Sequence, residues 1–180
     1  MLHIHWFLPR HLTDSLHPLL SISAHPSVEF LVIINPNSGP GDGSRPGHDY
    51  EREVPRLTSK PNVTTIGYVR VDYCKKPLHD ACEEIDRFAG WVTKHGSDVP
   101  GLSVDGIYVD ETPNHFSAGR KLYLEALHKH VKGKDGLLGQ RLVSLSGPIC
   151  CWLCHRRPYL PVSLSVLLLV NSPAASRTSD

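Results

Sequence analysis

The chain has 180 residues, of which 40% are hydrophobic and 21% are charged, and its formal net charge is +1. A chain of this length and composition is expected to form one well-buried globular domain. The balanced charge gives no electrostatic reason to expect a nucleic acid or an anionic membrane as partner. Five cysteines, three of them within residues 150–154, are not the pattern of a disulfide framework.

Apolar runs and helical periodicities alternate along the first three quarters of the chain. A short strand is predicted at residues 3–8 and a weak helix at 13–22. Residues 28–35, VEFLVIIN, form a nearly continuous β-branched and aromatic run, which indicates a strand covered on both faces, as in a parallel sheet. The Gly-rich loop at 36–43 matches neither the Walker pattern nor G-x-G-x-x-G, so nucleotide binding is not expected.

The pattern then repeats. The remaining predicted elements are a helix at 49–59, a strand at 63–69, a helix at 79–95, a strand at 104–111 and a helix at 117–131. Alternating strands and helices predict a parallel sheet with right-handed crossovers. In such folds the functional residues lie at the carboxyl ends of the strands.

The strand at 104–111, VDGIYVDE, ends in two acids, Asp110 and Glu111. Alternation predicts that Asp110 and Tyr108 point into a barrel mouth, while Ile107 and Val109 face the helices. Glu111 joins Asp110 only if the chain bends, which the proline two residues later favours. An apolar strand ending in acids is typical of an acid–base site, but a solvated turn is the structural alternative.

The segment after residue 135 has a different composition. It lacks acidic residues until Asp180 and is rich in Leu, Ser, Pro and Cys. We predict a barrel domain over 1–135 and an atypical tail over 136–180 that is disordered or poorly packed. A translated intron or a shifted reading frame would explain this tail, and sequencing a transcript across the codons near Lys134 tests that hypothesis.

Neither a metal nor another cofactor is predicted. Residues 151–155 read C-x-x-C-H, the haem-attachment pattern, but no export signal accompanies it and no fourth zinc ligand is evident. The N-terminus lacks the basic leader of a secretory signal. An apolar run of about eleven residues at 160–170 is short of the roughly 20 that span a bilayer. Asn62 begins an N-glycosylation sequon.

Four sequence blocks resemble the spherulin-4 family, the spherulation-specific, cell-surface proteins of fungi and slime moulds. They are FLVIINPNSGPG at 30–41, TIGYV at 65–69 with Tyr73 after it, the helix ending in Gly90-Trp91, and VDGIYVDE. The order and spacing of these blocks also fit. The resemblance covers about residues 25–132.

The resemblance implies a (β/α)8 barrel similar to endo-acting galactosaminidases, which cleave α-1,4-linked galactosamine polymers. It implies catalytic roles for Asp110 and Glu111, since glycoside cleavage needs two carboxyl groups. Residues at the mouth that are expected to bind a polysaccharide are Asn35, Asn37, Tyr68, Tyr73 and Tyr108. A location outside the cell or at its surface is also implied, whereas the oligomeric state is left open.

Two departures from the family qualify this expectation. A (β/α)8 barrel usually needs about 250 residues, so the chain is predicted to be a partial barrel, truncated after about four βα units, with an irregular C-terminal tail. A further acidic residue that the family carries on a later strand has no counterpart. The function predicted is therefore a glycoside hydrolase impaired by truncation. The alternatives are a non-catalytic cell-surface or carbohydrate-binding protein and an inactive fragment.

Overall fold

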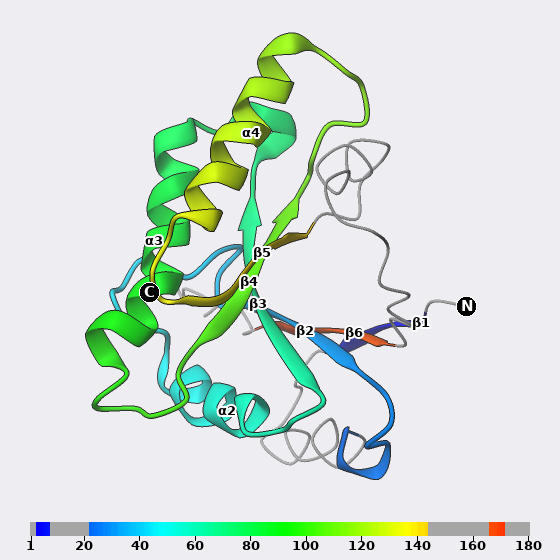
Figure 1. Ribbon diagram of the computed structural model, residues 1–180, viewed down its shortest axis with the longest axis vertical. Coiled ribbons are helices and arrows are strands. Elements are labelled where there is room, and N and C mark those ends of the chain that lie inside the picture. Colours follow the sequence, from blue (N-terminus) through cyan, green and yellow to red (C-terminus); the bar gives the residue numbers. More distant parts are fainter. Residues whose placement is uncertain (1–2, 8–21, 144–165, 172–180) are drawn as a thin grey trace, which may run out of the picture.

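The computed structural model describes residues 3–7, 22–143 and 166–171, which form a six-stranded parallel sheet with helices (Figure 1). The strands are β1 His3–Phe7, β2 Phe30–Asn35, β3 Val63–Arg70, β4 Val104–Asp110, β5 Leu137–Val143 and β6 Val166–Asn171. Their order across the sheet is β1-β6-β2-β3-β4-β5, and every neighbouring pair is parallel. The predicted α/β class is confirmed.

Three helices follow the central strands in turn: α2 His48–Thr58, α3 Leu78–His95 and α4 Ala118–Lys132. Each lies close to the range that hydrophobic periodicity predicts. A short turn, η1 Asp72–Cys74, separates β3 from α3. At the start of α4, the Ser117 hydroxyl caps the helix by accepting a hydrogen bond from the Arg120 N–H at 3.2 Å.

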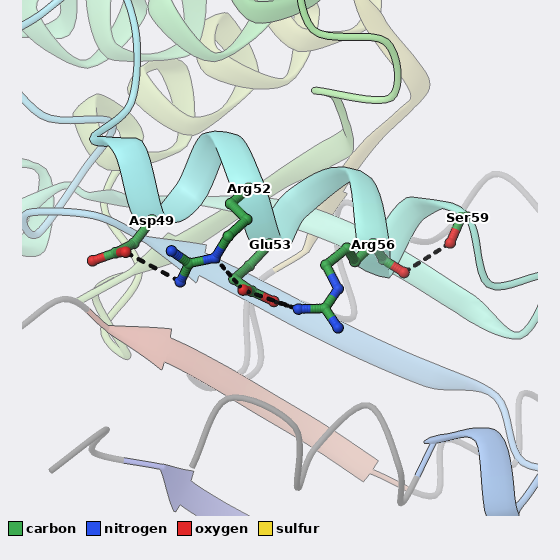
Figure 2. Close-up of polar contacts among 5 residues, drawn as sticks. All are labelled: Asp49, Arg52, Glu53, Arg56 and Ser59. Carbon is green, nitrogen blue, oxygen red and sulfur yellow. Dashed lines mark hydrogen bonds and ion pairs between the residues drawn. The ribbon is translucent and has the colours of Figure 1, made fainter. Parts of the chain in front are cut away.

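Helix α2 shows how a polar helix surface is stabilised away from the sheet (Figure 2). Arg52 pairs with Asp49 at 3.1 Å and with Glu53 at 2.7 Å, and Arg56 also pairs with Glu53 at 3.1 Å. Such exposed pairs contribute only about 0.2–1 kcal/mol each. Tyr50, Val54 and Leu57 of α2 are buried in the hydrophobic core and attach the helix to the sheet.

The two faces of the sheet have different environments. Residues of α2, α3 and α4 share the main hydrophobic core with one face, which includes Ile107 and Val109 as predicted. The other face carries a separate cluster that contains no helix residue: Leu31, Ile33, Ile66, Tyr68 and Tyr108. Helices on one face of a parallel sheet and a strand-only cluster on the other are the arrangement of a partial (β/α)8-type barrel.

Close packing between β3 and α3 depends on Gly67. A Cβ atom at this position would lie 2.8 Å from ring atoms of Phe88. The Phe88 ring is fully buried and lies edge-on to Trp91, with 4.9 Å between the ring centroids. The absent side chain therefore lets α3 approach the strand that carries Tyr68.

Two strands, β5 and β6, lie in the segment after residue 135, where no strand pattern was recognised. The proposed boundary between residues 135 and 136 stays a prediction. The C-x-x-C-H motif and nearly all of the helix expected at 13–22 lie outside the described residues. Among the helices of the described ranges, none has the length and apolarity needed to cross a membrane.

Candidate functional site

The carboxyl ends of β2, β3 and β4 lie along one edge of the sheet because all three strands are parallel. β3 and β4 are in a register that pairs Tyr68 with Tyr108 and Arg70 with Asp110. This register places the acidic end of VDGIYVDE beside the end of β3. We call Tyr68, Arg70, Tyr108, Asp110 and Glu111 the acidic-pair cluster.

Asp110 accepts a hydrogen bond on each carboxylate oxygen. The Tyr68 hydroxyl donates to Oδ2 at 2.6 Å, and the Glu111 N–H donates to Oδ1 at 2.8 Å. The Tyr68 and Tyr108 rings are tilted against each other with their centroids 5.9 Å apart. An ionised carboxylate can accept at both oxygens, so this arrangement suits a charged Asp110 in a fixed orientation.

Burial and the neighbouring acids change the acidity of both tyrosines. Burial, followed by the hydrogen bond to Asp110, raises the pKa of Tyr68 above its ordinary value. Burial, followed by the negative charge of Asp110, raises the pKa of Tyr108 to about 12. Both hydroxyls therefore keep their protons at neutral pH, and Tyr68 remains a hydrogen-bond donor to Asp110.

Glu111 lies at a bend of the backbone that directly follows Asp110. Its φ of +54° is in the left-handed region, which bends the chain directly after β4. Its Oε2 atom lies 3.8 Å from Nε of Arg70, the residue that is in register with Asp110. The bend after Asp110 that the sequence allows is therefore present, and the role of the two acids as a paired site stays a prediction.

Tyr73 lies in the loop that follows β3. Its N–H donates to the Glu111 carbonyl at 2.8 Å, and its side chain is 49% exposed. By contrast, Tyr68 is 9% exposed and Tyr108 is 7% exposed. Of the three tyrosines expected to meet sugar, only Tyr73 offers much of its ring to solvent, whereas the other two are mainly covered.

Asn35 and Asn37 lie in and after the end of β2. Oδ1 of the Asn35 side chain accepts a hydrogen bond from the Gly39 N–H at 3.1 Å. The backbone carbonyl of Asn35 accepts one from the Tyr50 hydroxyl at 3.0 Å. Asn37 is exposed, and its N–H donates to the Gly39 carbonyl at 3.1 Å. These contacts shape the β2–α2 loop, whereas Tyr68 and Arg70 reach the acidic pair directly.

Arg70 was not recognised in the sequence. The sequence feature that could have identified it is the alternation of side chains along β3, which places Arg70 on the same face as Tyr68, two residues earlier. A charged residue that ends an apolar strand deserves the same consideration as the acids of VDGIYVDE. Within the described ranges, no group of three or more His, Cys, Asp or Glu side chains could hold a metal ion.

The asparagine of the N-glycosylation sequon, Asn62, has a structural role inside the fold. Asn62 is 7% exposed, and its side-chain nitrogen donates to the carbonyls of His25 at 3.2 Å and Val28 at 3.0 Å. Both amide hydrogens are therefore used inside the fold. The folded chain does not offer this nitrogen for attachment of a glycan.

Known proteins are similar to this chain in sequence and in fold. The sequence profile of the spherulation-specific family 4, Spherulin4, matches residues 13–147. Spherulin-4 of Physarum polycephalum is 33% identical over 120 residues, which are 67% of this chain and 32% of that protein. The crystal structure of Aspergillus clavatus Sph3 in complex with GalNAc superposes with a TM-score of 0.67 at 40% identity, covering 73% of this chain and 51% of that one.

The chain thus spans about a third of one relative and about half of the other. The family profile covers most of the sequence, including the strands β2 to β5 and the acidic-pair cluster. These matches agree with the α/β fold of the chain. The chain belongs to the spherulation-specific family 4.

Proposed function

We propose that this protein is a glycoside hydrolase-type protein that acts on a galactosamine-containing polysaccharide, with Asp110 and Glu111 as its catalytic carboxyl groups. The observation that carries the proposal is the fixed acidic pair at the carboxyl edge of a barrel-type sheet. The 40% identity to Sph3, whose crystal structure holds GalNAc, supports the class of substrate. Family membership supports a location outside the cell or at its surface.

The geometry suggests different tasks for the two acids. Glycoside hydrolysis needs one carboxyl group to protonate the leaving oxygen and a second, ionised one as base, nucleophile or charge stabiliser. Asp110 suits the ionised task because two donors hold its oxygens. Glu111, turned to the same edge, is the second carboxyl group. Tyr68 keeps Asp110 oriented, which reduces the reorganisation needed at the transition state.

The polysaccharide would be met by groups of different kinds. The exposed Tyr73 ring is the proposed stacking surface for a sugar face. Tyr68 and Tyr108, being buried, would act mainly through their hydroxyls. Asn35 and Asn37 would line the same edge from the β2–α2 loop, where Asn37 is the more accessible of the two.

A carbohydrate-binding protein without turnover is the second candidate. It is favoured by the half-exposed Tyr73 ring, because stacking on a sugar needs no catalytic carboxylate. On this alternative, Tyr73→Ala weakens binding and Asp110→Asn changes little. The two candidates therefore differ in which substitution matters.

The test measures reducing ends released from a galactosamine-rich polymer. We expect activity in the wild type and a loss of roughly 100-fold or more in Asp110→Asn, since the substitution keeps the size of the side chain and removes its charge. The control is Glu125→Gln, which removes an exposed acid from α4, where Glu125 pairs only loosely with Lys121 at 3.9 Å. Retention of the polymer without products would favour the binding protein, and no retention would contradict both candidates.

A further inference from the structure

The turn η1 has an unusual backbone for its sequence. Asp72, Tyr73 and Cys74 have φ values of +46°, +53° and +66°, and none of them is glycine. Residues other than glycine enter the left-handed region rarely, and three in succession are disfavoured by contacts of each Cβ with the backbone. Such conformations persist where surrounding structure determines them, and they gather at functional sites.

The surrounding structure here is the acidic end of β4. Val71 N–H donates to the Asp110 carbonyl at 3.1 Å, and Tyr73 N–H donates to the Glu111 carbonyl at 2.8 Å. The first contact extends the pairing of β3 with β4 past Arg70 and Asp110. The second is made within the left-handed turn, by the amide that follows Asp72.

Glu111 itself has a left-handed φ of +54°. In this bend the Glu111 N–H donates to Oδ1 of Asp110, and the Glu111 carboxylate lies 3.8 Å from Arg70. Two left-handed segments, one after each strand, are thus joined through a single backbone hydrogen bond.

We propose that the left-handed turn Asp72–Cys74 is a positioning element that holds Glu111 in its bent conformation and thereby sets the relative orientation of the Asp110 and Glu111 carboxyl groups. This inference rests on the proposed function for its catalytic consequence. Its structural part concerns only the coupling of two backbone amides, those of Tyr73 and Glu111. The two parts can be tested separately.

Substitutions at Asp72 separate backbone conformation from side-chain chemistry. The Asp72 carboxylate makes no hydrogen bond or ion pair within the described ranges. Asp72→Asn and Asp72→Gly accept a positive φ, whereas the β-branched side chain of Asp72→Val does not. All three variants remove the same charge, so a difference between them reports conformation.

The structural readout is amide hydrogen exchange by NMR. In the wild type, Asp72→Asn and Asp72→Gly, we expect the Tyr73 and Glu111 amides to be protected. In Asp72→Val both should lose protection together by about tenfold or more, while amides in the middle of β3 and α3 keep theirs and show that the chain is folded. A Glu111 amide that stays protected when the Tyr73 amide does not would overturn the proposal.

The catalytic readout is kcat on the galactosamine polymer. A displacement of about 1 Å at reacting groups can cost roughly 100-fold, so Asp72→Val should lower kcat by that order with little change in KM. Asp72→Asn and Asp72→Gly should stay within about twofold of the wild type. Equal losses in all three variants, or full activity in Asp72→Val, would contradict positioning. A wild type that is inactive refutes the proposed function, and the exchange result alone then decides on the coupling.

Discussion

Replacing Gly67 by Ala tests the packing that brings α3 against the site-bearing strand. The new Cβ would lie 2.8 Å from three ring atoms of Phe88, a separation that real Cβ contacts do not show. The ring has little room to yield because it is fully buried and lies against Trp91. Overpacking of this kind costs about 1–3 kcal/mol.

A smaller effect has the opposite sign. Replacing a strand glycine by alanine lowers the conformational entropy of the unfolded chain, which raises the free energy of unfolding by about 0.4–1 kcal/mol. The net expectation is a loss of about 1–2 kcal/mol in the free energy of unfolding. For a chain of this size, that corresponds to a fall in Tm of roughly 2–8 °C, which circular dichroism can measure.

Two further variants make the test specific. Gly119→Ala in α4 is the control, because its Cβ would have nothing within 4 Å, and it should raise stability by up to about 1 kcal/mol. In the double variant Gly67→Ala with Phe88→Leu, the smaller side chain should relieve the clash. Its cost should be less than the sum of the single costs by about 1 kcal/mol. A neutral Gly67→Ala, or strictly additive costs, would refute the reasoning.

Two other predictions follow from the buried polar groups. Asn62→Ala should lower the free energy of unfolding by about 1–3 kcal/mol, because the carbonyls of His25 and Val28 lose their donor; urea denaturation measures this, and an unchanged midpoint would contradict it. Tyr108 has a pKa of about 12 when folded and 10.0 ordinarily. Its protonated form therefore adds stability below pH 10 that is lost as the pH rises to about 12, amounting to about 2–3 kcal/mol. Tyr108→Phe should make that part of the pH profile less steep in urea denaturation, the remaining slope including Tyr68, whose pKa burial also raises, and parallel profiles would count against it.

Hydrophobic pattern was sufficient for the central part of the fold. The run VEFLVIIN predicts β2, and the spacing of Ala81, Ile85 and Phe88 predicts α3, because each pattern has one structure that buries it. The alternation in VDGIYVDE also predicts that Ile107 and Val109 face the helices. These are local signals, and the structure agrees with them.

Features that depend on contacts with residues far away in the sequence could not be predicted from the hydrophobic pattern. The left-handed turn at Asp72 has no glycine to indicate it, since its conformation is tied to Glu111 on another strand. Arg70 acquires its place beside Glu111 only through the register of β3 with β4. The sequence therefore supports the acids at the strand end, whereas their orientation requires the tertiary contacts.

The position of β6 has a consequence for how the chain folds. β2, β3, β4 and β5 are neighbours both in the sheet and in sequence, so they can assemble progressively during synthesis. β6 pairs with β1 on one side and with β2 on the other, although among the described strands it comes last in sequence. Until it is made, β2 has an open edge that can pair with another chain. Completion of the sheet at this side is a late, long-range step, and we expect it to limit the rate of folding.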